Sequence, residues 1–210
     1  MAIVWPCPIP VDAYAAAGEN PEVPRADCPA CTRPMEFWWG YHRFVRDTGR
    51  SLRIWVRRGH CTGCETTHAL LPAFVVRKRL DTVETIGAVI EGVTAGSSGV
   101  RPAAAALGVP HTTARGWLRR FSANARRLAV AFAALAVELG GDAPTLSADP
   151  CVAALAAIAS AWRAASALPG WLAVDQWRLC TSVCGGSFLA TNTNAPWLIV
   201  GKRRFMPPVP

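Results

Sequence analysis

The chain has 210 residues, of which 51% are hydrophobic and 17% are charged, and it carries a net charge of +8 with a sequence pI near 9.5. This composition excludes global disorder and predicts one ordinary domain or two small ones with a buried core. The positive charge favours a polyanionic partner, either nucleic acid or an acidic membrane surface.

The N-terminal segment MAIVWPCPIPVDAY does not have the pattern of a secretory signal, because it lacks a basic stretch followed by a long apolar one. The longest apolar runs, residues 128–137 and 151–162, are shorter than the roughly 18–20 residues that span a bilayer. We therefore expect a cytoplasmic, nucleoid-associated protein with no membrane partner and with reduced cysteines. Residues 1–24, rich in proline and alanine, are expected to be an irregular leader.

Residues 25–75 are expected to form a zinc ribbon. Two CxxC motifs, CPAC and CTGC, flank an arginine- and tryptophan-rich segment whose alternating residues predict two strands around a turn at residues 47–50. Two CxxC turns at opposite ends of a hairpin supply the four soft ligands that tetrahedral zinc requires. In a reducing compartment, paired CxxC motifs favour a metal site over disulfides or a thioredoxin-like redox site. We predict one structural zinc ion bound by Cys28, Cys31, Cys61 and Cys64.

The protein fills all four positions of this predicted shell, so no position is open for a catalytic water. His60 and His68 flank the second CxxC motif and are alternative ligands, but the four thiolates are favoured, with His60 at the surface or hydrogen-bonded to a ligand. Cys180 and Cys184 are expected to be buried thiols. Because zinc binding is worth ~10–16 kcal/mol in small peptides, folding of the ribbon is expected to require the metal.

Residues 81–127 are expected to form a helix-turn-helix domain. Asp81 is predicted to cap a first helix, with Glu84 at the capping-box position, and residues 95–99 to end it. In the segment VRPAAAALGVPHTTARGWLRRF, Ala104 is the small residue that allows close packing of two helices, and Gly108 is the turn residue. The apolar residues expected to lock the two helices together are Ala103, Leu107, Val109, Ala114 and either Trp117 or Leu118.

The second of these helices, about residues 111–120, is predicted to bind double-stranded DNA. In the major groove, arginine pairs with guanine and threonine meets thymine methyls or phosphates, and a helix N-terminus favours a phosphate. Gly116 costs this helix about 1 kcal/mol relative to alanine. The alternative is an ordinary helical hairpin with a solvated basic face. The candidate DNA-binding residues are His111, Thr112, Thr113, Arg115, Arg119 and Arg120.

The strands of the ribbon carry a second basic surface. Arginines interleaved with aromatic residues can follow phosphates or stack on unpaired bases, which makes an RNA-binding protein one alternative function. Equally, the aromatic residues could pack on the next domain and leave the arginines in solvent. The residues of this surface are Arg43, Arg46, Arg50, Arg53, Arg57, Arg58, Trp39, Tyr41 and Trp55.

Residues 128–168 are predicted to form an alanine-rich helical hairpin, whose second helix starts with Asp149 as cap and Pro150 as first residue. Residues 169–210 are expected to be an irregular, basic, proline-rich tail. These apolar helices and the tail could dock a transposase or a second copy of the chain, so a protein-interaction adaptor is another alternative function. The expected fold class is mostly α with a small β zinc ribbon.

The order of CPAC, RIWVRRGHCTGCETTHALLPAF and RPAAAALGVPHTTARGWLRRF resembles the N-terminal recognition half of bacterial transposases. It is also similar to a family of uncharacterised bacterial zinc-ribbon and helix-turn-helix proteins associated with mobile elements. This resemblance implies an accessory targeting factor or regulator of a mobile element. A strand-transfer domain needs three carboxylates on an RNase-H-like sheet, whereas the segment after residue 127 holds four acids in helical, loop and tail contexts. We therefore expect neither an enzyme nor a small-molecule substrate.

Overall fold

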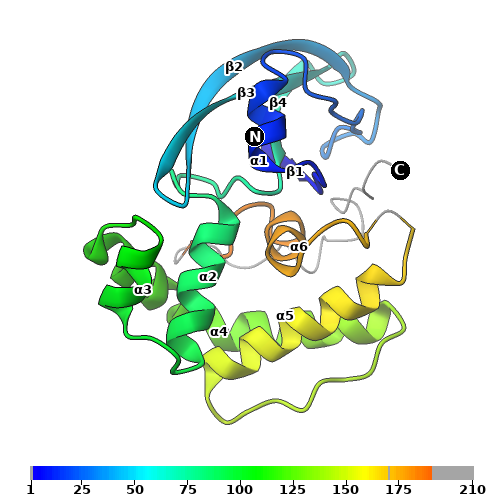
Figure 1. Cartoon of the computed structure of the whole chain (residues 1–210). Helices are drawn as coiled ribbons and strands as arrows, with labels where there is room; N and C mark the ends of the chain where they lie inside the picture. The colour runs from blue at the N-terminus through cyan, green and yellow to red at the C-terminus, as the bar shows by residue number, and fades with distance from the viewer. Residues whose placement is uncertain (1, 170, 191–210) are drawn as a thin grey trace.

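A computed structural model describes residues 2–169 and 171–190, in which a four-stranded sheet lies over a layer of helices (Figure 1). The fold of this part is mixed α/β, so the expectation of a mostly α chain with a small ribbon understated the sheet. The elements in chain order are β1 (Ala2–Trp5), α1 (Val11–Ala16), β2 (Glu36–Asp47), β3 (Arg50–Cys61), β4 (Thr66–Pro72), α2 (Val83–Thr94), α3 (Val100–Ala106), α4 (His111–Glu138), α5 (Pro150–Ser166) and α6 (Gln176–Val183).

The sheet is built on the predicted hairpin, because β2 and β3 pair antiparallel on either side of the turn at residues 47–50. The strand order is β1-β4-β3-β2, with β4 antiparallel to β3 and β1 parallel to β4. Alternating residues of β3, Ile54 and Val56, are buried in the core of the sheet layer, as their period of two predicts.

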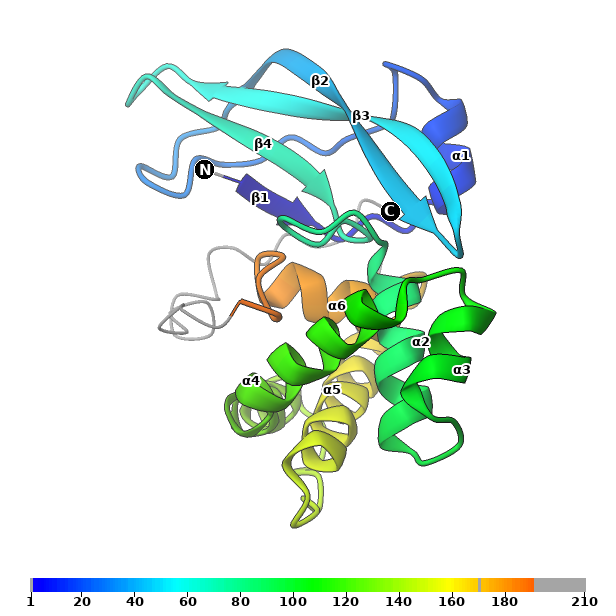
Figure 2. The same ribbon diagram turned by 90° about the vertical axis from the view of Figure 1, so that its left-hand side faces the viewer.

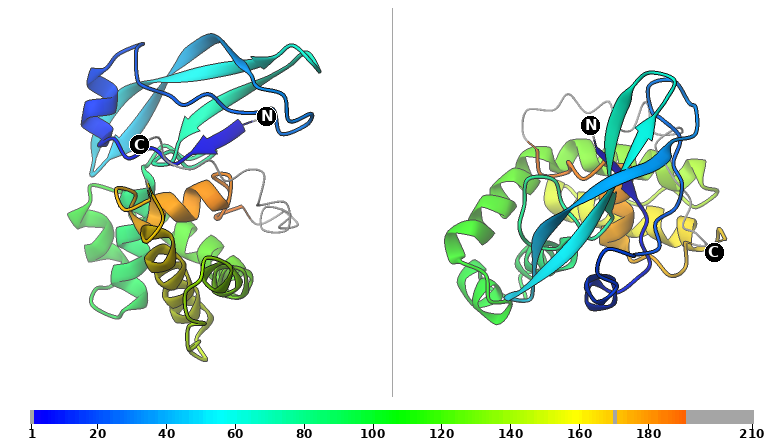
Figure 3. Two further views of the ribbon diagram at one scale, coloured as in Figure 1. Left: turned by 90° about the vertical axis from the view of Figure 1, so that its right-hand side faces the viewer. Right: turned by 90° about the horizontal axis from the view of Figure 1, so that it is seen from above.

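The expected irregular leader is wrong for much of residues 2–16, which form β1 and α1. Val11 and Tyr14 lie one helical turn apart on α1, and both are buried against the sheet layer. The Tyr14 hydroxyl donates a hydrogen bond to the carbonyl oxygen of Trp55 in β3 (3.1 Å). The N-terminal segment therefore completes the core around which the hairpin curves (Figure 3).

Helix α2 begins with a different cap from the one predicted. Thr82 is the N-cap, and its hydroxyl accepts a hydrogen bond from the backbone N–H of Thr85. The predicted cap Asp81 instead forms a buried ion pair with Arg46 of β2 (2.6 Å), and Glu84 pairs with Arg178 of α6 (2.5 Å). The capping-box prediction fails because both acids pair with arginines that are distant in the sequence.

Helices α3 and α4 lie on either side of a turn at Gly108, whose φ is +64°, in the order helix, turn, helix that the sequence predicts. Ala104 is buried, and Trp117 rather than Leu118 is the fully packed residue of the two candidates. Helix α4 does not end near residue 120, as predicted, but continues to Glu138. The predicted boundary between residues 127 and 128 thus falls inside a single helix, because buried residues recur every three or four positions through it: Phe121, Ala125, Leu128 and Phe132.

Helix α5 begins as predicted, since Asp149 accepts hydrogen bonds from the backbone N–H groups of Cys151 (2.7 Å) and Val152 (3.0 Å). The expected irregular tail is wrong for residues 176–183, because Asp175 caps α6 in the same way. Residues 191–210 of that tail lie outside the described residues. Across the described part of the chain, no helix is both long enough and apolar enough to cross a membrane.

The sheet layer and the helix layer each bury their own core and are joined by polar contacts. Arg178 of α6 is buried and donates hydrogen bonds to the carbonyl oxygens of Cys7 and Ile9 (2.8 Å each), in addition to its pair with Glu84. Its guanidinium also lies 5.4 Å from the ring centroid of Phe74. One arginine thus connects α6, α2 and the N-terminal segment.

Candidate metal centre and helix-turn-helix surface

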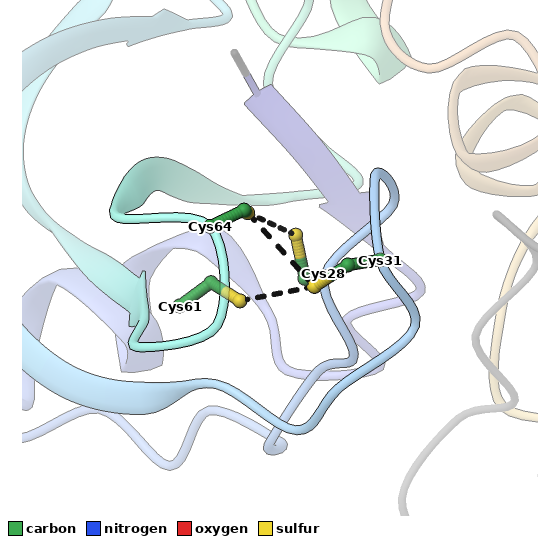
Figure 4. Close-up of side chains that lie close together, drawn as sticks. All are labelled: Cys28, Cys31, Cys61 and Cys64. Carbon is green, nitrogen blue, oxygen red and sulfur yellow. Dashed lines mark hydrogen bonds between the residues drawn. The ribbon is translucent and has the colours of Figure 1, made fainter.

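The four predicted cysteines come together at one end of the sheet, two from the loop before β2, one from the end of β3 and one from the β3–β4 turn (Figure 4). Their Sγ atoms all lie within 4.8 Å of one another, with 3.5 Å between Cys28 and Cys64 and 3.3 Å between Cys31 and Cys61. Four sulfurs at ~2.3 Å from a tetrahedral zinc ion are about 3.8 Å apart. The cluster is therefore compatible with one metal ion, and the all-thiolate donor set favours zinc.

Both CxxC turns end in a residue with a left-handed backbone. Thr32 follows Cys31 with a φ of 61°, and Glu65 follows Cys64 with a φ of 53°. A non-glycine residue in this region costs on the order of 1–3 kcal/mol. In the first turn, the backbone N–H of Thr32 donates to the carbonyl oxygen of Cys28 (2.8 Å), which fixes the tight loop. These strained backbone conformations therefore help to orient the two sulfurs of each turn toward one point.

The hydrogen bonds within the cluster favour thiolates at some positions and oppose them at others. Burial raises the pKa of Cys28, but hydrogen bonds from the backbone N–H groups of Ala30 and Cys31 and from neighbouring thiols outweigh it and lower this pKa to about 5. A backbone N–H from Arg33 favours the Cys31 thiolate, yet the adjacent sulfurs, Cys61 foremost, raise its pKa to about 12. Four thiolates at these separations repel one another, so a cation is needed to ionise the whole set.

The histidine in contact with the cluster is His68, not His60. The buried His68 places its Nε2 3.7 Å from the Cys28 sulfur and 3.1 Å from the hydroxyl of Thr66, which in turn lies 3.0 Å from the Cys64 sulfur. His60 instead pairs with Glu65 (3.4 Å). Neither histidine belongs to the converging set of ligand atoms among the described residues. His68 and Thr66 are positioned to orient the ligands through hydrogen bonds.

The six candidate DNA-binding residues divide by exposure. Thr112, Arg115 and Arg119 are exposed, and their spacing of three and four residues puts them on one face of α4. His111 and Thr113 are half-buried at the start of the helix. Arg120 is also half-buried, and it donates a hydrogen bond to the carbonyl oxygen of Gly116 on its own helix (3.0 Å). Three of the six candidates therefore form a single exposed polar and basic face.

The tip of the β2–β3 hairpin packs directly against the turn between α3 and α4 (Figure 2). A Cβ atom on Gly108 would lie only 2.9 Å from the Cα atom of Gly49. Beside this contact, the carboxylate of Asp47 accepts a hydrogen bond from the Thr82 hydroxyl (2.8 Å), and the backbone N–H of Thr48 donates to the side chain of Thr85 (3.1 Å). The hairpin, whose strand β3 ends at Cys61 of the cluster, thus contacts both the start of α2 and the turn before α4.

The expected basic surface of the hairpin is largely used inside the molecule. Arg43 donates hydrogen bonds to the carbonyl oxygens of Val76 (3.1 Å) and Arg79, and Arg46 pairs with Asp81. Arg50 and Arg57 bond to α1 and the segment after it, through Asp12 (2.9 Å) and the carbonyl oxygen of Glu19 (3.0 Å). These arginines are therefore bonded to neighbouring segments of the chain, which the alternation of residue types could not show.

The exposure of Trp38 was missed from the sequence. A β-bulge between Phe37 and Trp39 interrupts the alternation of β2, so Trp38 and Trp39 are 65% and 69% exposed, although they are adjacent. The Trp-Trp pair was visible in the sequence, but alternation predicts that one of two adjacent residues points inward. The bulge leaves both indoles at the surface.

Cys180 on α6 and Cys184 directly after this helix are both buried, as expected. Burial raises the pKa of Cys184 well above its ordinary value, as it does for Cys7, whose pKa rises to about 12. Cys7 and Cys184 therefore stay protonated and pack as small apolar side chains.

The comparison with family models matches residues 28–114 to a domain of unknown function, DUF6431. The matched segment starts at the first cysteine of the cluster and runs through the hairpin, α2 and α3 to the first residues of α4. No curated protein and no solved structure matches the chain. The chain is therefore similar to this domain from the four cysteines to the start of α4.

Proposed function

We propose that the chain is a zinc-folded, non-catalytic DNA-binding protein that inserts the first turns of α4 into the major groove. The observation that carries this proposal is the exposed face of Thr112, Arg115 and Arg119, directly after the Gly108 turn of the helix-turn-helix. These side chains suit base edges and phosphates in a groove that admits one helix. The net charge of +8 supports a polyanionic ligand.

In this proposal the metal is structural. The four cysteine ligands fill a tetrahedral shell, so zinc has no position left for a water or a substrate. Its role is to hold the CxxC turns and the hairpin, whose tip at Gly49 supports the turn before α4. Zinc would act on DNA binding only through folding.

The biological setting rests on resemblance. The order of cysteine turns, hairpin and helix-turn-helix resembles the recognition half of bacterial transposases, and we propose an accessory targeting factor or regulator of a mobile element. Its partners would be double-stranded DNA and a transposase.

A second candidate function, a protein-interaction adaptor, is favoured by exposed apolar residues on the helix layer. Val130 and Val137 are 68% and 53% exposed and lie two turns apart on one face of α4. Apolar residues at this spacing suit helix-to-helix contact with a partner or a second copy. If the replacement of both by aspartate changes neither the sedimentation coefficient of the protein nor its co-purification with the element's transposase, this candidate is rejected.

The test of DNA binding starts from the selection of bound duplexes out of a random pool, followed by fluorescence anisotropy with the selected duplex. Arg115→Ala and Arg119→Ala should each weaken binding by about 1–3 kcal/mol for a lost base contact. Arg163→Ala is the matched control, because Arg163 is an exposed arginine on a different helix, α5. Equal affinities for all three variants and the wild type would reject the proposal, and a chelator arm reports whether binding needs the metal.

A further inference from the structure

We propose that a depression on the hairpin binds an unpaired nucleotide of single-stranded nucleic acid, at a site separate from the duplex-binding face of α4. The depression has a volume of about 600 Å³ and is lined by Trp38, Trp39, Arg58 and Thr67. This volume is within the roughly 300–1,000 Å³ typical of small-molecule sites. The lining combines two flat aromatic surfaces with one cation and one hydroxyl.

The indoles are held at the surface by the strand itself. The bulge after Phe37 exposes both Trp38 and Trp39, and the ring of Trp38 lies 5.6 Å from that of His60. Trp39 lies edge-on to Trp55 at 6.5 Å. Trp55 crosses the strand over Gly40, where any side chain would meet its ring at 2.2 Å. The two exposed indoles are therefore supported from behind, as a stacking platform requires.

Arg58 supplies the positive charge of the depression. It pairs directly with Trp39 across the strands, and its guanidinium donates a hydrogen bond to the hydroxyl of Thr67. Its Nε is buried and has no acceptor among the described residues. A buried donor without an acceptor is unfavourable, and the rest of the guanidinium belongs to a residue that lines the depression, where a phosphate or base oxygen would pair with its charge.

These two observations select the chemistry of the occupant. Stacking on indoles needs a planar π-face, and the positive guanidinium of Arg58 favours an anionic or carbonyl oxygen. An unpaired nucleotide carries both within one residue of its chain. A base inside a duplex has its faces covered by its neighbours and cannot stack on the platform, so the site discriminates for single strands.

The position of the depression relates it to the helix-turn-helix. Trp39 lies eight residues along β2 from Asp47, which is next to the hairpin tip that contacts the α3–α4 turn. At ~3.3 Å per residue this separation is about 26 Å, the length of roughly eight base pairs. A junction between duplex and unpaired strand is the ligand that reaches both ends of the hairpin.

The test uses the full-length, zinc-loaded protein and fluorescence anisotropy with labelled ten-nucleotide oligothymidylate and oligouridylate at two salt concentrations. Trp38→Ala and Trp39→Ala should each weaken binding by at least about 5-fold, the loss of one stacked base. Arg58→Gln should weaken binding and lower the salt slope by ~0.7. The two oligonucleotides report whether the sugar of DNA or of RNA is preferred.

Phe44→Ala is the matched control, because Phe44 is an exposed aromatic residue of the same strand that does not line the depression. Trp38→Phe and Trp39→Phe keep a stacking ring and should restore most of the affinity, which separates stacking from folding. Unchanged affinity in both alanine variants, or an equal loss in Phe44→Ala, would overturn the proposal. Binding of a proline-rich peptide at the indoles with no binding of either oligonucleotide would also overturn it.

This site does not depend on the proposed duplex binding. The variants Arg115→Ala and Arg119→Ala should retain oligothymidylate binding, because neither residue lines the depression. A loss of duplex binding alone in these variants therefore does not contradict the single-strand site. The tryptophan variants are expected to lose oligothymidylate binding and to retain duplex binding.

Discussion

Replacing Arg178 with methionine is the most direct test of how the two layers are joined. Methionine keeps the length and most of the volume of the side chain but removes its charge and its donors. The carbonyl oxygens of Cys7 and Ile9 and the carboxylate of Glu84 then lose a partner at 2.5–2.8 Å. The substitution thus leaves an acceptor unpaired in each layer.

The magnitude follows from burial. Arg178 is only 7% exposed, and breaking a buried ion pair by removing one partner costs about 3–5 kcal/mol. This range already includes the cost of leaving the carbonyl oxygens of Cys7 and Ile9 without a donor, because energies of interactions made by one side chain are not additive. We expect the free energy of unfolding to fall by ~3–5 kcal/mol at neutral pH, measured by urea denaturation of the zinc-loaded protein.

The loss of unfolding free energy in Arg178→Met should also depend on pH. Burial raises the pKa of Glu84, and Arg178 opposes this rise, so Glu84 in the variant has a still higher folded-state pKa. A raised folded pKa favours the folded state at acid pH, and that contribution is lost as the pH rises through it. The variant should therefore be closest to the wild type at acid pH and furthest from it at alkaline pH.

Arg50→Met is the control for the loss of an arginine ion pair. Arg50 and Asp12 are each 60% exposed, and water screens such pairs, so this variant should be close to the wild type. If Arg178→Met lowers the stability no more than Arg50→Met does, the buried arginine does not join the layers in the way described.

Three further outcomes test the metal site and the turn. Cys61→Ser should abolish stoichiometric zinc in metal analysis and remove the β-sheet signal from circular dichroism; a folded, zinc-free variant would contradict a structural ion. His68→Ala should weaken zinc binding by about 10–100-fold in a chelator competition, and unchanged affinity would mean that its contact with the cluster is incidental. Gly108→Ala should destabilise the fold by more than Gly140→Ala, because both glycines have positive φ, which costs about 1–2 kcal/mol for alanine, but a methyl group meets neighbouring backbone only at Gly108. Equal losses of unfolding free energy would show that the contact at this turn does not matter.

The sequence predicted the parts of the molecule that depend on local patterns. The two CxxC turns, the hairpin around residues 47–50 and the turn at Gly108 each follow from residues close together in the chain, and the structure has all three. The four cysteines could be paired across 29 intervening residues because tetrahedral coordination demands four donors, so that two incomplete motifs imply one site.

The remaining features depend on partners that are distant in the sequence. Aspartate commonly caps helices, so the sequence favours Asp81 as a cap. Its buried ion pair depends on Arg46, which comes from the distant hairpin. Strand β1 was hidden because four residues near prolines carry too little pattern, and it is stabilised by parallel pairing with β4. The bulge at Trp38 was equally invisible, since it is a property of the pairing of two strands.

The contact between Gly49 and Gly108 has a thermodynamic consequence. If the chain binds DNA as proposed, and if metal binding orders the hairpin and the hairpin tip restricts the α3–α4 turn, zinc and DNA are linked ligands of one conformational equilibrium. Linkage is reciprocal: whatever factor zinc contributes to DNA affinity, bound DNA contributes to zinc affinity. The DNA-bound protein should therefore lose zinc to a chelator less readily than the free protein. A substitution of Gly108 that separates the hairpin tip from the α3–α4 turn should reduce both the effect of zinc on DNA affinity and the effect of DNA on zinc affinity.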